Sequence, residues 1–222
     1  MGYYMDAENM SLSALQQRIE STDLVPSRVS LLQGIGATMA ALAQHGMNTT
    51  ADLRTALKTN KRLEAVAQAT GISADYLVLL RREVESYFPK PFPLKEFTWL
   101  PGEDIARLEA NGVGQTAVFY QICHDPERMA ELENAAQVDA ATLETLTHLC
   151  GLTRVQWVSP MFARMLLEAG YDSAAAVAAA DAEALHAALL QINEGDRYFK
   201  GKIGLRDIKR LIHAAGYVAD SR

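Results

Sequence analysis

Apolar and polar positions follow one pattern three times along this chain, in segments that align on a glycine expected to close a helix. The segments are 33–46, 99–112 and 157–170. The first two copies continue in register, at a constant offset and without a gap, from Gly46 and Gly112 as far as Ile72 and Val138. Chance similarity rarely persists over such a length. The pattern therefore predicts an all-α protein made of three tandem repeats.

Each aligned glycine is followed by one apolar residue and then by a polar start signal for a new helix. Glycine permits the left-handed turn that ends one helix, and a Thr, Asp or Ser oxygen caps the free amides of the next. A similar break recurs later in each repeat, at 70–73, 136–139 and 201–204. We therefore expect each repeat to contain paired helix-hairpin-helix motifs, with short helices in an orthogonal or solenoid-like array.

Other helix boundaries are marked by caps and by a proline-rich break. Asp125 and Ser159 each precede a proline that suits the first turn of a helix, and Asp181 opens another helix. Residues 89–96 begin with alternate prolines, which favour an extended, semi-rigid linker. We expect a leading helix at 11–19 and the first repeat within residues 1–88, the second and third repeats within 97–222, and partial disorder at 1–9.

Composition is that of an ordinary globular protein, with 49% hydrophobic and 22% charged residues. No apolar run approaches the ~20 residues that cross a bilayer, and the start lacks the order of a secretory signal, so we expect a cytoplasmic protein without membrane contact. The two cysteines, Cys123 and Cys150, form no ligand-like pair and are expected to be buried. The formal charge of −6 equals the excess of acidic over basic residues within 97–154.

Three stretches carry a resemblance to a known family: residues 152–155, 162–173 and 185–194. They resemble a bacterial family described only as a domain of unknown function, whose members are similar to tandem helix-hairpin-helix proteins. The likeness covers residues 97–222, and residues 31–87 resemble a further half-domain of the same kind. The resemblance implies the repeat fold. The Gly-apolar-Gly hairpin of the family type is kept only at residues 34–36 and is absent at 100–102 and 158–160.

That remaining hairpin is the first candidate binding site. A Gly-apolar-Gly turn exposes backbone amides at a helix N-terminus, where the helix dipole and free N–H groups attract phosphate. The alternative is that the glycines only permit a tight turn with the apolar residue packed inward. No basic residue immediately follows the turn. The candidate anion-binding residues here are Gly34, Ile35, Gly36, Ala37 and Thr38.

The second candidate is a basic segment near the C-terminus, where residues 197–213 hold six Lys or Arg and one acidic residue. On a helix that starts near residue 204 or 205, three of these bases share a face, with two lysines in the preceding loop. The alternative is a solvated helix surface with basic residues favoured near a C-terminal end. The candidate residues are Lys200, Lys202, Arg206, Lys209 and Arg210.

The sequence does not indicate an enzyme, because it has no catalytic triad, phosphate-binding glycine loop or carboxylate pair in a supporting context. Cys123-His124 and His148-x-Cys150 are too widely separated for a metal site, so we expect no metal and no cofactor. Trp99 and Trp157 occupy equivalent repeat positions and are expected to anchor the core.

The sequence thus favours a non-enzymatic helix-hairpin-helix binding module with weak, sequence-independent affinity for the phosphate backbone of DNA or RNA. The alternative is a protein-interaction scaffold that does not bind nucleic acid and uses its acidic middle repeat to dock a basic partner. Because that acidic repeat would repel a duplex laid across it, nucleic acid should contact only the ends.

Overall fold

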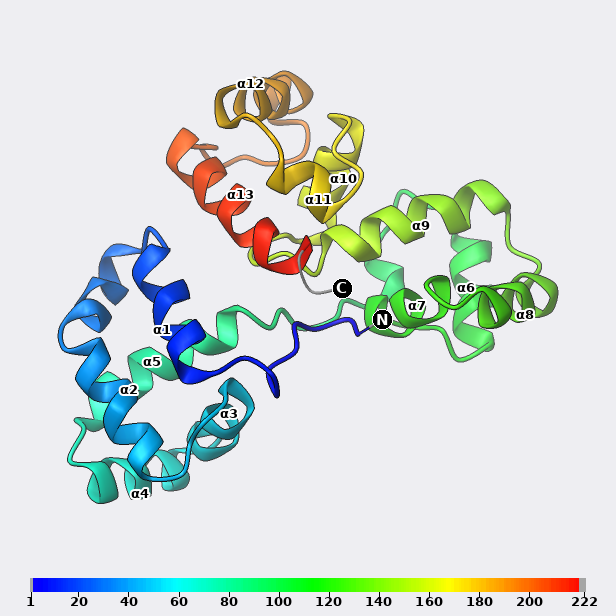
Figure 1. Cartoon of the computed structure of the whole chain (residues 1–222). Helices are drawn as coiled ribbons and strands as arrows, with labels where there is room; N and C mark the ends of the chain where they lie inside the picture. The colour runs from blue at the N-terminus through cyan, green and yellow to red at the C-terminus, as the bar shows by residue number, and fades with distance from the viewer. Residues whose placement is uncertain (1, 220–222) are drawn as a thin grey trace. The chain divides into compact units, whose positions relative to one another are not determined.

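The computed structural model of the chain describes residues 2–219, and helices are the regular secondary structure found there (Figure 1). Only isolated backbone bridges, and no strands, occur within these described residues. The prediction of an all-α fold is confirmed. Residues 1 and 220–222, which the predicted segment boundaries include, lie outside the described residues.

The chain forms two compact units. We call Asp6–Phe88 the N-terminal unit, and residues 2–5 together with residues 89–219 the C-terminal unit. Because residues 2–5 belong to the C-terminal unit, the chain passes between the units once near residue 5 and again near residue 88.

The N-terminal unit consists of a leading helix, a short 3-10 helix and one four-helix segment, α2 to α5, which we call the first segment. The leading helix is close to the range expected from the sequence. The bounds are α1 (Leu12–Ser21), η1 (Pro26–Leu32), α2 (Ile35–Gln44), α3 (Thr50–Leu57), α4 (Asn60–Thr70) and α5 (Ala74–Ser86).

The C-terminal unit contains η2 (Leu94–Glu96) and two further four-helix segments. The second segment comprises α6 (Gly102–Ala110), α7 (Thr116–Cys123), α8 (Pro126–Ala136) and α9 (Ala140–Leu152). The third comprises α10 (Pro160–Glu168), α11 (Ala174–Ala178), α12 (Ala182–Ile192) and α13 (Leu205–Ala219), with η3 (Glu194–Asp196) between its last two helices. α13 packs closely against α11 and α12.

The first two segments have matching boundaries. Helices α7, α8 and α9 begin and end at the same constant offset from α3, α4 and α5 that separates Gly46 from Gly112, so the register predicted as far as residue 138 continues to residue 152. In the third segment, α10 begins and ends where the alignment of Gly112 with Gly170 places the equivalent of α6. Its last helix, α13, begins later than this alignment predicts because the preceding connection is longer.

The glycine that closes the first helix of each segment has one geometry throughout. Gly46, Gly112 and Gly170 have φ values of 82°, 79° and 86°, in the left-handed region that favours glycine. In each turn the amide of the next residue donates to the carbonyl five positions back, as Val113 does to Leu108 at 2.9 Å. This 6→1 bond is characteristic of the Schellman motif. The predicted role of these glycines is confirmed.

The predicted caps of Asp125, Ser159 and Asp181 are also confirmed. Each side chain accepts a hydrogen bond from the backbone amide three residues later, which satisfies one of the free donors at a helix start. Thr49 forms a capping box with Asp52 at the start of α3. These local signals explain why the short helices begin where they do.

An extended strip precedes both of the first two segments. In the C-terminal unit, Leu94 donates its amide to Gly114 and Thr116 donates its amide to Phe92, both at 2.9 Å. In the N-terminal unit, residues 10–12 pair with residues 48–50 in the same way. The residues that receive the strip are equivalent in the repeat alignment, and the C-terminal half of the proline-rich segment is therefore packed within its own unit.

The expectation of disorder at residues 1–9 is wrong for Tyr3 and Met5, which are buried. The Tyr3 hydroxyl shares hydrogen bonds with Thr116 at 3.1 Å and Thr153 at 3.4 Å, and the Tyr3 carbonyl accepts from Arg154 Nε at 2.7 Å. These contacts attach Tyr3 to the C-terminal unit. The sequence pattern did not indicate these distant partners.

Candidate functional site

The Gly34 turn opens α2 in the N-terminal unit. Gly34 adopts a left-handed conformation, with φ 71° and ψ 18°, directly before the first helical residue. Ile35 is buried, whereas Gly34, Gly36 and Ala37 are exposed. The amide of Thr38 already donates to the Gly34 carbonyl at 3.0 Å. Ile35 therefore packs inward, as the alternative interpretation expects, while the backbone on either side of it faces solvent.

The amides of Gly36 and Ala37 have no oxygen partner among the described residues. They belong to the first turn of α2, where the positive end of the helix dipole lies. No neighbour lies within 4 Å of a Cβ built on Gly34, so this side of the turn is open. On the other side, Gln16 Nε2 of α1 lies 3.5 Å from a Cβ built on Gly36. The leading helix thus borders the turn without covering it.

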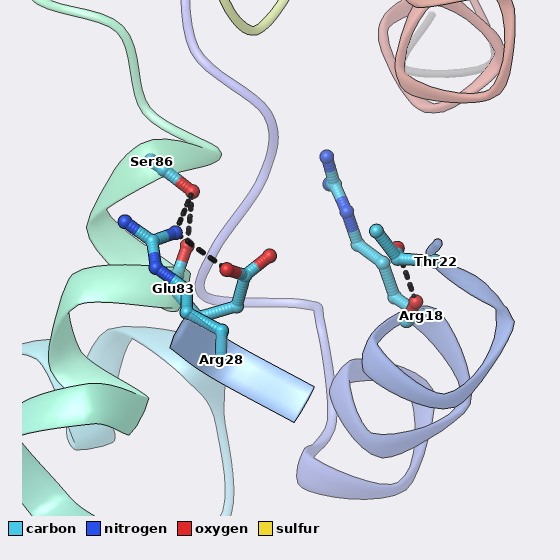
Figure 2. A network of polar contacts seen from close by, with 5 residues as sticks. All are labelled: Arg18, Thr22, Arg28, Glu83 and Ser86. Carbon is cyan, nitrogen blue, oxygen red and sulfur yellow. Dashed lines mark hydrogen bonds and ion pairs between the residues drawn. The ribbon is translucent and has the colours of Figure 1, made fainter. Parts of the chain in front are cut away.

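A polar network holds the approach to this turn (Figure 2). Arg28 of η1 donates to Glu83 of α5 at 2.5 Å and to Ser86 at 3.3 Å, and Ser86 donates to the Glu83 carbonyl. Glu83 is buried, so removal of Arg28 would leave a buried charge without its partner. Figure 2 also shows Thr22 donating to the Arg18 carbonyl, which ends α1. The network fixes η1, and hence the start of α2, against α5.

The terminal basic helix begins at Leu205, as predicted. Two of its candidate bases are engaged within the C-terminal unit: Lys209 pairs with Glu183 of α12 at 3.3 Å, and Arg210 pairs with Asp207 at 3.3 Å. The Arg210 side chain is only 10% exposed. These two residues therefore present less free positive charge than the helical spacing alone suggests.

Lys200, Lys202 and Arg206 are exposed. Among the described residues, no carboxylate pairs with either lysine. All the bases of this set precede or occupy the first two turns of α13, and its last turn contains none. The explanation that basic residues gather at a helix C-terminus is therefore wrong, since the dipole disfavours cations at this end.

One acidic residue of the second segment does not belong to its surface. Asp104 is buried, where it accepts from Arg107 and from Thr142 Oγ1, the latter at 2.7 Å. The Arg107 guanidinium and the Thr142 hydroxyl hold the pKa of Asp104 below its ordinary value. The exposed acids of this segment are Glu103, Glu109, Glu127, Glu131, Glu133, Asp139 and Glu144.

The cysteines and histidines form no metal site within residues 2–219. Cys150 is buried as expected, and Cys123 is half-buried, where desolvation raises the pKa of its thiol to about 11. A thiol with a raised pKa is a poor nucleophile at neutral pH. Over the same residues, no helix combines the length and the apolar character needed to cross a bilayer.

The expectation that both tryptophans anchor the core is wrong for Trp157, which is 49% exposed. Trp157 has a φ of 70° because it lies in a tight turn that the Val158 amide closes on the Val155 carbonyl at 3.1 Å. The two valines are buried, and this turn directs the indole to solvent. Trp99 is half-buried and packs edge-on against Phe97.

The sequence interpretation placed Lys200 and Lys202 in the connection between α12 and α13 but missed the aromatic residue beside them. The connection holds Phe199, which is 46% exposed, in a conformation set by the buried Asn193. The signal was present in the repeat alignment, since the equivalent connections of the first two segments, 71–73 and 137–139, are far shorter than this one, 193–204. An insertion at one fixed place in a repeat is typical of a functional loop.

One family model matches the chain. It is described as "Domain of unknown function (DUF4332)" and matches residues 102–217, from the start of α6 into the last turn of α13. No curated protein and no solved structure matches the chain. The predicted resemblance to a domain of unknown function is confirmed.

Proposed function

The chain belongs to this family of domains of unknown function, and we propose that it is a non-enzymatic binding module of three tandem helix-hairpin-helix repeats that contacts the phosphate backbone of nucleic acid irrespective of sequence. The repeat interpretation is supported by the recurring helix boundaries and by the matching closing turns at Gly46, Gly112 and Gly170. Each segment supplies two helix pairs in this interpretation, joined by short turns except for the longer connection between α12 and α13.

The observation that carries the proposal is the open Gly34 turn. Two amides without protein acceptors, at Gly36 and Ala37, lie on an exposed helix N-terminus with free space above Gly34. A phosphate oxygen is a suitable acceptor for such amides and is favoured by the helix dipole. The contact is to backbone atoms of both molecules, so it carries no sequence information. Weak, sequence-independent binding is the expected result.

The terminal basic segment supplies a second phosphate contact in this proposal. Lys200, Lys202 and Arg206 are its exposed members, and Lys209 and Arg210 support them from paired positions. Because few bases are available, few phosphate contacts form. The logarithm of the binding constant should therefore fall only gradually with the logarithm of the salt concentration, with a slope of about one for each phosphate contact.

The test is a titration of labelled single-stranded and duplex oligonucleotides at about 50 and 200 mM salt. Gly36→Asp places a negative charge beside the amides, where it should repel phosphate and weaken binding on the order of tenfold. Because an acidic side chain at a helix N-terminus interacts favourably with the helix dipole, the variant should not lose stability. Gly102→Asp is the matched control because Gly102 occupies the equivalent position in the second segment, at the start of α6. It should leave binding unchanged. Absence of binding at low salt overturns the proposal.

A second candidate, a protein-interaction scaffold, is favoured by the exposed acids of α6 and α8. Glu127 and Glu131 lie one turn apart on α8, where they can face a basic partner together. Two results together would select this function. The unaltered chain captures a basic protein and binds no oligonucleotide, and a Glu127→Lys/Glu131→Lys variant no longer captures that protein.

A further inference from the structure

The connection from residue 193 to residue 204, which we call the Phe199 loop, distinguishes the third segment from the other two. The equivalent connections are only 71–73 and 137–139. A connection of that short kind joins the corresponding helices of the first and second segments. The additional residues of the Phe199 loop are therefore a feature of the third segment alone.

The loop has a fixed conformation. Asn193 is buried and donates from Nδ2 to the Phe199 carbonyl at 2.7 Å. Its Oδ1 accepts from the amides of Tyr198 at 3.0 Å and Phe199 at 2.9 Å. The Tyr198 hydroxyl donates to Glu168 of α10 at 2.6 Å, which attaches the loop to a neighbouring helix. A ligand that uses this loop would lose little entropy in ordering it.

The Phe199 ring is presented to solvent on this fixed backbone, with 46% of the residue exposed. A Cβ built on Gly201 would lie 2.6 Å from ring atoms Cε1 and Cζ, so the ring rests against the bare backbone of Gly201. A side chain at this position would displace the ring. An exposed aromatic ring on a fixed backbone is a stacking platform.

The neighbourhood of the loop contains cations and aromatic rings in alternation. The Arg164 guanidinium lies 5.0 Å from the ring centroids of both Trp99 and Tyr198. Arg197 lies 4.7 Å from the Tyr198 ring. Such contacts hold the guanidinium groups in place, and Arg164 is held further because its Nε donates to Glu168 at 2.7 Å.

The charge beside the ring indicates the kind of occupant. Lys200 and Lys202 flank Gly201, are exposed, and have no carboxylate partner among the described residues. The loop's acids, Glu194 and Asp196, lie in η3 at its opposite end. An anionic ligand that also offers a flat apolar face would satisfy both the lysines and the ring.

We propose that the Phe199 loop binds single-stranded nucleic acid, with one base stacked on Phe199 and the flanking phosphates contacted by Lys200 and Lys202. The inference rests on the proposed nucleic-acid binding and adds the substrate class. Single strands fit because their bases present free faces, whereas the bases of a duplex stack on one another. A single aromatic ring between two lysines provides little apolar area for a membrane surface.

The experiment compares three labelled probes of about 15 nucleotides at low salt: a single strand, the same strand in a duplex, and a strand of abasic sugar-phosphate. Phe199→Ala should weaken single-strand binding about tenfold and leave duplex and abasic binding unchanged. Gly201→Ala keeps the Phe199 ring but moves it, so this variant should also bind the single-stranded probe more weakly. Phe199→Trp should bind the single strand as the unaltered chain does, and the stacked base should quench the fluorescence of the new tryptophan.

Leu190→Ala is the matched control, because Leu190 on α12 is 48% exposed and has no equivalent pair of lysines beside it in the sequence. It should not change binding. Equal losses on the single-stranded and abasic probes, or no loss in Phe199→Ala, overturn the inference while leaving the proposed function intact. Absence of binding to every probe overturns both. Binding only to phosphatidylcholine vesicles that contain about 30% phosphatidylserine, lost in Phe199→Ala, would assign the loop to a membrane instead.

Discussion

The connection before the last helix is minimal in the second segment and elaborate in the third. At residues 137–139 the chain reverses through a single left-handed residue, Gln137, and continues directly into α9. At the equivalent place in the third segment, Asn193 organises a loop that exposes an aromatic ring. The helices that follow the two connections, α9 and α13, bury apolar residues at equivalent positions. Packing therefore constrains the helices, and the connection is where one segment differs in surface chemistry.

The largest effect should come from core positions that the segments share. Leu77, Leu143 and Ile208 occupy the same place in α5, α9 and α13, and all three are buried. Alanine at any of them should lower the free energy of unfolding by about 2–5 kcal/mol, because a cavity remains. Urea denaturation measures this loss. The exposed Glu144→Ala is the control, and a loss below about 1 kcal/mol at any of the three would break the equivalence.

The Phe199 loop should depend on Asn193 more than a short connection depends on any polar side chain. Asn193→Ala removes three hydrogen bonds and leaves their partners half-buried, so a loss of about 2 kcal/mol is expected. Asn134→Ala is the control, since Asn134 makes one exposed bond to Ala130. Hydrogen exchange at the Phe199 amide should accelerate only in the first variant. Equal behaviour of the two variants would mean that the loop is not anchored by Asn193.

The short connections allow a test in which two substitutions should change stability in opposite directions. Gly71 and Gln137 are equivalent residues with φ values of 71° and 49°. Gly71→Ala should destabilise by about 1 kcal/mol, because a side chain is disfavoured in the left-handed region. Gln137→Gly should relieve that strain, offset in part by the greater entropy of the unfolded chain. Thermal unfolding of the two variants should shift in opposite directions, and a shift of the same sign would show that the two turns are not equivalent.

Several parts of the fold could be predicted because they depend on local chemistry. The closing glycines follow from the need for positive φ, and the caps at Asp125, Ser159 and Asp181 follow from free amides at helix starts. The constant offset between the first two segments then places their helices without any knowledge of tertiary contacts.

Other features depend on partners far away in the sequence. Tyr3 is ordered by Thr116 and Thr153, and Lys209 pairs with Glu183 on another helix. Neither pairing has a sequence periodicity. The exposure of Trp157 follows from a left-handed turn that a tryptophan rarely adopts, so its alignment with the other tryptophan was misleading. The candidate site at the Gly34 turn was predictable, whereas the exposure of Phe199 required the loop geometry.

The smallest expected effect is a pH dependence that belongs to the second segment. Asp104 has Thr38 as its equivalent in the first segment, where no carboxyl is present. The contacts with Arg107 and Thr142 hold the Asp104 pKa below its ordinary value, so the folded state binds its proton less readily than the unfolded state. The stabilisation is therefore complete above the ordinary pKa of about 4 and is lost as the pH falls through the lower, folded-state pKa.

Asp104→Asn should consequently be less stable than the unaltered chain at pH 7, by no more than about 1 kcal/mol because Arg107 is partly exposed. The difference should shrink as the pH is lowered below about 4. Urea denaturation of both chains across that range measures it, with Thr38→Val as the counterpart in the first segment, whose effect should not vary over the same pH range. A difference that persists unchanged in acid would mean that the carboxylate charge contributes nothing, and that the Asp104 contact stabilises the second segment only through its hydrogen bonds.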